Sequence, residues 1–163
     1  TGAIGLMPDF FTGRVLINLD SEDEGILYIG CAGGMDTTGT MKYISEPAGK
    51  NNKALEIAVT GLRGGHSGDE IHKGFGNSVK IMNRLLWNLS NKYNISLSNF
   101  DGGNLRNAIP REAFATIIIS KQSAAEIKSW IENFYLTISE EFREIEKDLK
   151  ISVKERKSWW NIN

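Results

Sequence analysis

The sequence predicts an α+β protein whose larger part has the ferredoxin-like order strand, helix, strand, strand, helix, strand. This order places both helices on one face of an antiparallel sheet. Two observations lead to this prediction: short strand-like segments after residue 53, and two long apolar stripes at helical spacing between them. The glycine-rich stretch of residues 1–40 lies outside this order and predicts part of a second, α/β-type unit.

The first strand of the ferredoxin-like order is predicted at residues 54–60. Leu55, Ile57 and Val59 alternate there with less apolar neighbours. Such period-two alternation is typical of a strand that buries one face. Alternation and β-branched residues predict the other three strands at residues 95–100, 113–119 and 151–155.

Two apolar stripes with spacings of three and four residues predict the helices. The first stripe runs from Phe75 to Tyr93. The second follows Ser123 and Glu126, which have the three-residue spacing of a capping box, and it continues to Leu149. This second stripe predicts a helix of about 25 residues, roughly 38 Å long.

The beginning of the chain contains two short apolar runs, residues 14–19 and 26–31, which predict buried strands. The chain starts with Thr1 and has no basic-plus-apolar signal segment. We therefore expect a piece of a longer protein. Residues 41–53 are polar and contain turn formers, which predicts a boundary between units or a hairpin loop there.

The charge balance argues against two classes of partner. With 19 Lys and Arg and 20 Asp and Glu, the net charge is −1. This value gives no electrostatic reason to expect nucleic acid or an anionic membrane as a partner. No apolar run approaches the roughly 20 residues that span a bilayer. The single cysteine, Cys31, has no intramolecular disulfide partner, which fits a cytoplasmic protein.

Three polar clusters contain side chains suited to chemistry. In the first, Asp20 follows a predicted buried strand, where α/β folds bind ligands and where a carboxylate suits a metal ion. The alternative for this cluster is a solvated acidic turn. In the second, His66 stands between glycines that let the backbone approach a ligand closely. Its alternative is a surface loop with an incidental histidine.

The third cluster is a polar loop that contains Arg106, Asn107 and Arg111. Arginine binds carboxylates through two parallel hydrogen bonds, and asparagine offers both a donor and an acceptor. The cluster would therefore suit the carboxylate end of a peptide. A polar hairpin connection is the alternative.

Four segments of the chain, taken in order, resemble the bacterial aminoacyl-histidine (Xaa-His, carnosinase-like) dipeptidases. The segments are TGAIGL, INLDSEDEG with IGCAGG, GLRGGHSGDEIH and GGNLRNAIPREA. These enzymes belong to a clan of co-catalytic zinc metallopeptidases. The resemblance covers most of residues 1–115. It implies a catalytic α/β domain and a smaller ferredoxin-like lid that mediates homodimerisation. Residues 1–36 would then be a remnant of the catalytic domain, and residues 37–163 a truncated lid.

The resemblance also implies roles for single residues. Asp20 matches a metal ligand, and His66 matches the lid histidine that polarises the scissile carbonyl, often across the dimer. Asn107 and Arg106, with Arg111, match positions near the carboxylate end of the dipeptide substrate. Two divalent metal ions, most simply zinc, are expected in the full-length enzyme.

The general-base glutamate and the other metal ligands of the family have no counterpart in this chain. We therefore expect it to hold no metal tightly and to hydrolyse no dipeptide alone. The alternative interpretation is a stand-alone ferredoxin-like module that binds small molecules or regulates a partner by sheet pairing, because glycine-rich loops beside such a core fit both.

Overall fold

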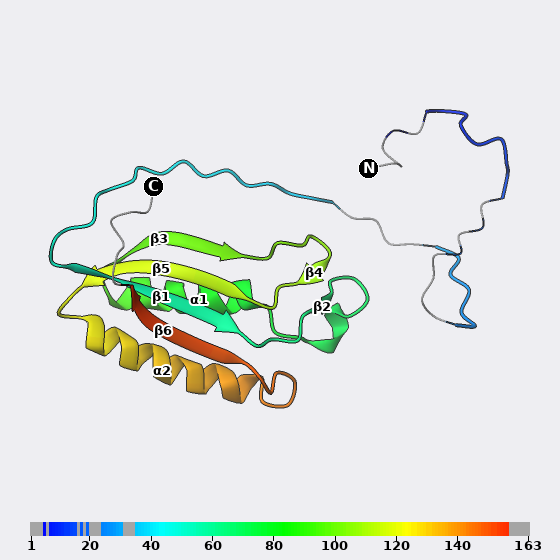
Figure 1. Cartoon of the computed structure of the whole chain (residues 1–163). Helices are drawn as coiled ribbons and strands as arrows, with labels where there is room; N and C mark the ends of the chain where they lie inside the picture. The colour runs from blue at the N-terminus through cyan, green and yellow to red at the C-terminus, as the bar shows by residue number, and fades with distance from the viewer. Residues whose placement is uncertain are drawn as a thin grey trace. The chain divides into compact units, whose positions relative to one another are not determined.

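The computed structural model describes residues 5, 7–15, 17, 19, 24–30 and 35–156. The chain divides into two compact units, Thr1–Tyr43 and Ile44–Asn163. Among the described residues, every strand and α-helix belongs to the second unit (Figure 1).

The second unit is built on a four-stranded antiparallel sheet with the strand order β3-β5-β1-β6. β1 (Asn52–Thr60) lies between β5 (Ala113–Ser120) and β6 (Lys150–Arg156), and β3 (Ile95–Gly102) is the edge strand next to β5. The order along the chain and in the sheet is ferredoxin-like, as predicted. The four predicted strands are confirmed to within two residues at each end.

Two helices, α1 (Ser78–Lys92) and α2 (Ala124–Glu141), cover one face of the sheet (Figure 1). None of the helices in the described part of the chain is long and apolar enough to cross a membrane. The core lies between the sheet and this helical layer. Its fully buried side chains include Leu55, Ile57, Val59, Met82, Leu85, Leu89, Ile117, Ile119, Ile127, Ile131 and Ile138.

The second helix is shorter than predicted, because it ends at Glu141 rather than near Leu149. The carbonyl of Phe142 accepts hydrogen bonds from the backbone N–H groups of both Ile145 and Glu146, which closes the chain into turns. Leu149 is nevertheless buried. The apolar stripe therefore continues past the helix end, and this continuation made the predicted helix too long.

The predicted capping box is also wrong. Ser123 already has a helical backbone conformation, with φ −85° and ψ −4°, and its side chain makes no cap hydrogen bond. Its hydroxyl donates instead to the carbonyl of Ser120 at 3.1 Å, while Glu126 accepts from the hydroxyl of Tyr93 at 2.8 Å. An N-cap side chain reaches the first turn from an extended backbone, which this serine lacks.

The two strands predicted in the first unit are not found among the described residues. Residues 26–30 form no strand, and neither do the described positions of the run 14–19. The side chains of Leu27 and Ile29 are 86% and 98% exposed. A strand needs a neighbour for its backbone hydrogen bonds, and the described part of this unit offers none.

Candidate functional site

A short ribbon that the sequence did not predict brings two of the predicted clusters together. β2 (Gly65–His66) pairs antiparallel with β4 (Ala108–Ile109), so that His66 lies opposite Ala108. The N–H of Ser67 donates to the carbonyl of Asn107 at 2.9 Å and extends this pairing. The turn residue Asn107, which directly precedes β4, therefore lies next to the end of β2, where His66 is. The β2–β4 ribbon lies at one end of the four-stranded sheet (Figure 1).

The paired glycines before His66 are required by close contacts of the loop. Gly64 has φ +67°, a left-handed conformation that favours glycine. A Cβ atom at Gly64 would collide with Arg111 Cγ, and one at Gly65 would lie 2.5 Å from Glu70 Oε2. Both glycines thus allow a neighbouring side chain to lie directly against the loop backbone.

The imidazole of His66 is oriented by backbone donors. Its Nδ1 accepts from the N–H groups of Gly68 and Asp69, each at 3.2 Å. These bonds assign the neutral tautomer in which the proton is on Nε2. A protonated ring would instead donate to Asp69 Oδ2, which lies 3.4 Å from Nδ1, and would lose both backbone bonds. The His66 side chain is 50% exposed, so a ligand can reach the ring.

Glu70, which the sequence analysis missed, supports the same turn. Its Oε2 accepts from the N–H of His66 at 2.8 Å, and its Oε1 accepts from Lys73 Nζ at 2.9 Å. The hydrogen bond from Lys73, followed by that from His66, holds the pKa of Glu70 below its usual range. The sequence signal for Glu70 was its position four residues after His66, because side chains at this spacing can lie close together when the chain turns as in a helix.

Of the other predicted site residues, Arg111 lies against the loop that carries His66. Arg111 donates from Nε to the carbonyl of Leu62 at 3.2 Å, and its stem lies against Gly64. Arg106 and Asn107 are exposed beside the ribbon. Asp20 lies outside the described residues, so the structure does not test its predicted role.

Residues 48–146, more than half of the chain, match the family described as "Peptidase dimerisation domain". The chain belongs to this family. The match covers β1, β3 and β5 of the sheet, both helices and the ribbon, while β6 follows it, so the predicted lid fold is that of a peptidase dimerisation domain.

Individual relatives agree with the predicted resemblance. The cytosol non-specific dipeptidase of Escherichia coli (strain K12) is 41% identical over 150 residues, which are 92% of this chain and 31% of that protein. The crystal structure of aminoacylhistidine dipeptidase from Vibrio alginolyticus matches 96% of this chain and 32% of its own, with a TM-score of 0.78 and 34% identity. The chain spans about a third of the length of these relatives.

A more distant structure shares the fold alone. A putative amidohydrolase/peptidase from Burkholderia cenocepacia matches 64% of this chain and 27% of its own, with a TM-score of 0.52 and 13% identity. Membership of the dimerisation domain family favours the peptidase interpretation over the stand-alone module.

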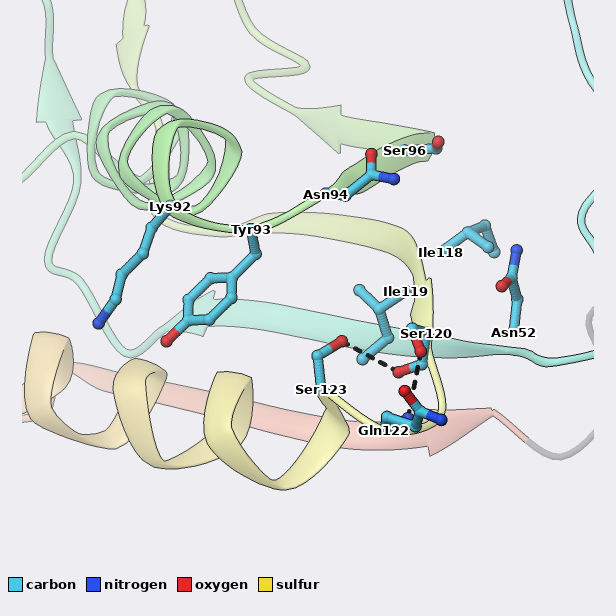
Figure 2. A pocket seen from close by; sticks show the side chains of 10 residues that line it. All are labelled: Asn52, Lys92, Tyr93, Asn94, Ser96, Ile118, Ile119, Ser120, Gln122 and Ser123. Atoms are coloured by element: carbon cyan, nitrogen blue, oxygen red, sulfur yellow. Dashed lines mark hydrogen bonds between the residues drawn. The ribbon is translucent and has the colours of Figure 1, made fainter.

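Two clefts lie at opposite ends of the sheet of the dimerisation domain. The first, of about 520 Å³, adjoins the ribbon and is lined by Gly65, Leu105, Arg111 and Phe114 among others. The second, of about 440 Å³, lies between the end of α1 and the start of α2 (Figure 2). Its lining is mostly polar but contains none of the predicted site residues. We therefore assign the candidate functional site to the ribbon end.

Proposed function

We propose that this chain provides the lid of a metal-dependent dipeptidase that hydrolyses Xaa-His dipeptides in the cytoplasm. The observation that supports this proposal is the orientation of His66. Two backbone donors occupy Nδ1 of a half-exposed side chain, which leaves Nε2 to carry the proton, and the turn residue Asn107 lies next to this loop. The sequence and structural likeness to two dipeptidases supplies the reaction class.

In the proposed reaction, water attacks the scissile carbonyl carbon, and negative charge develops on the carbonyl oxygen. His66 Nε2–H donates a hydrogen bond to this oxygen as the charge forms. A positioned donor of this kind contributes about 10²–10³-fold to the rate. This hydrogen bond stabilises the oxyanion without transfer of the proton from Nε2.

The other polar residues at the ribbon would bind the carboxylate end of the dipeptide. Asn107 and Arg106 are exposed in the turn that precedes β4, and the Asn107 carbonyl accepts from the N–H of Ser67, the residue after His66. Arg111 uses Nε to hold the Leu62 carbonyl, and the terminal amino groups of its guanidinium suit a carboxylate.

The proposed enzyme uses two divalent metal ions, most simply zinc. Within the described residues, no group of three His, Cys, Asp or Glu side chains is arranged to hold a metal ion. Asp20 is proposed as one ligand, together with ligands from the catalytic domain.

A chimera tests this function directly. The matching segment of the Escherichia coli dipeptidase is replaced by this chain, and hydrolysis of Ala-His is measured in the presence of zinc. We expect turnover by the chimera, a fall of about 10²-fold or more in His66→Ala, and no turnover by the chain alone. A control variant, His72→Ala, should retain the activity of the chimera. Unchanged rates in His66→Ala would contradict the proposal.

We also propose that two copies associate through the β3 edge. β3 is an edge strand whose Leu97 and Phe100 side chains are 56% and 36% exposed. The opposite edge, β6, carries Glu155 between Lys53 and Lys128, and such charges discourage pairing between strand edges. The less charged edge is therefore the one suited to pair with a second copy.

Sedimentation of the 163-residue chain tests this surface. A dimer is expected for the wild type, and Leu97→Lys should weaken association about tenfold or more by placing a charge in the interface. Ser152→Lys on β6 is the matched control and should leave the dimer intact. Equal effects of the two variants would exclude β3 as the interface.

A further inference from the structure

The loop that carries His66 is fastened at both ends by one buried carboxylate. Glu146, in the turns after α2, is only 4% exposed. Its Oε2 accepts from the N–H of Arg63 at 2.8 Å, and its Oε1 accepts from the N–H of Gly76 at 2.7 Å. Arg63 and Gly76 flank His66 on either side, and Glu146 follows it by 80 residues in the sequence.

The base of this loop is packed closely around the carboxylate. A Cβ atom at Gly76 would lie 2.8 Å from Leu62 Cδ2 and 3.3 Å from Glu146 Oε1. The guanidinium of Arg63 lies over the ring of Phe75, 4.7 Å from its centre. The two ends of the loop are therefore held together, and only a residue without a side chain fits at Gly76.

The loop needs this fastening because its own sequence is flexible. It contains several glycines, whose conformational freedom in the unfolded chain makes an ordered loop costly. The contacts that orient the ring lie within the loop itself, at Gly68, Asp69 and Glu70. These contacts orient the ring only while the loop keeps its folded shape, and Glu146 holds the two ends of the loop together.

We propose that Glu146 is a positioning residue that holds residues 63–76 closed and thereby keeps His66 in its Nε2–H tautomer at the β2–β4 ribbon. Its effect on hydrolysis rests on the proposed function of His66. Its effect on the loop does not, and the two are measured separately.

The direct test is NMR of the 163-residue chain and its Glu146→Gln variant. Glutamine keeps one acceptor oxygen but turns an NH₂ group toward the second backbone N–H. We expect amide exchange at Gly68, Asp69 and Gly76 to accelerate about 10- to 100-fold, as the loss of a charged hydrogen bond predicts. The imidazole ¹⁵N shifts of His66 should move toward a mixture of tautomers, while the amide shifts of β3, which lies outside the loop, serve as a reference.

Two further variants make the result decisive. Gly76→Ala disturbs the same contact from the loop side and should reproduce the changes, even if Glu146→Gln fails to fold. Tyr135→Phe removes a hydrogen bond to the Leu149 carbonyl near the same turns without touching the loop. The proposal is overturned if Glu146→Gln and Gly76→Ala leave the His66 shifts and the loop exchange as they are in Tyr135→Phe.

In the chimera with the Escherichia coli dipeptidase, Glu146→Gln should lower kcat about tenfold with little change in KM, because the donor to the oxyanion is displaced. If the His66 shifts change but kcat does not, Glu146 holds the loop as proposed. The same result would refute the proposed role of His66 in hydrolysis. Unaltered shifts would refute the role of Glu146 itself.

Discussion

Substitution of Gly64 by alanine is expected to destabilise the chain through two separable effects. The first is backbone strain, because an alanine at φ +67° costs about 1–2 kcal/mol. The second is the collision of the new Cβ atom with Arg111 Cγ. The arginine stem can move away, but it then gives up the bond from Nε to the Leu62 carbonyl, which is worth about 1–2 kcal/mol.

The free energy of unfolding of Gly64→Ala should therefore fall by about 2–4 kcal/mol, the sum of the two effects. In an Arg111→Ala background the collision partner is already gone, so the same substitution should cost only about 1–2 kcal/mol. The double-mutant cycle then yields a coupling energy of about 1–2 kcal/mol between the two positions.

Urea unfolding of the four proteins, followed by circular dichroism, measures these values. Gly39→Ala is the matched control, because a Cβ atom there has no atom within 4 Å and the backbone is not left-handed. Its effect should stay within about 0.5 kcal/mol. If Gly64→Ala costs the same in both backgrounds, Arg111 does not support the loop in the way that the contact indicates.

Three further outcomes follow from the same contacts. Leu85→Ala should lose about 2–5 kcal/mol of unfolding free energy, because its side chain is fully buried, whereas Leu136→Ala, at 63% exposure, should lose less than about 0.5 kcal/mol in the same urea titration. Because the folded-state pKa of Glu70 is lowered, its stabilisation of the turn is fully present above the unfolded-state pKa and is lost as the pH falls through the lowered value. The exchange protection of the His66 amide should fall over this range, and Glu70→Gln should abolish that dependence. The exposed pair of Arg84 and Glu141 should show a coupling of only about 0.5 kcal/mol in a double-mutant cycle, and less in 1 M salt.

The sheet and helices were predictable because their signals are local. Leu55, Ile57 and Val59 alternate with Glu56, Ala58 and Thr60, which remain partly exposed, and this alternation is visible without knowing what covers the strand. The end of α2 was not predictable by the same reasoning. Leu149 is buried like a helical residue although the chain has already turned, and periodicity records burial rather than backbone conformation.

The candidate site was predictable as separate clusters but not as an arrangement. The glycines around His66 indicated a close approach to a ligand by composition alone. The amide of Asn107 and the neighbouring arginines indicated carboxylate binding in the same way. Their pairing through β2 and β4 depends on backbone hydrogen bonds between segments about 40 residues apart, which leave no pattern in the sequence. Glu146 was missed for a similar reason, because an acid in a polar turn becomes an anchor only when folding buries it.

The position of His66 therefore depends on segments that fold together only when the whole sheet forms. Its loop is held by Glu146, which follows α2 in the chain, and by Asn107, which directly precedes β4. Arg111 also holds the start of the loop through the Leu62 carbonyl. At least one partner in each of these contacts lies outside the glycine-rich loop, so a destabilised core should release the loop before the sheet itself unfolds. Core substitutions that leave the chain folded are thus expected to impair the placement of the histidine first, although no core side chain is placed at the candidate site.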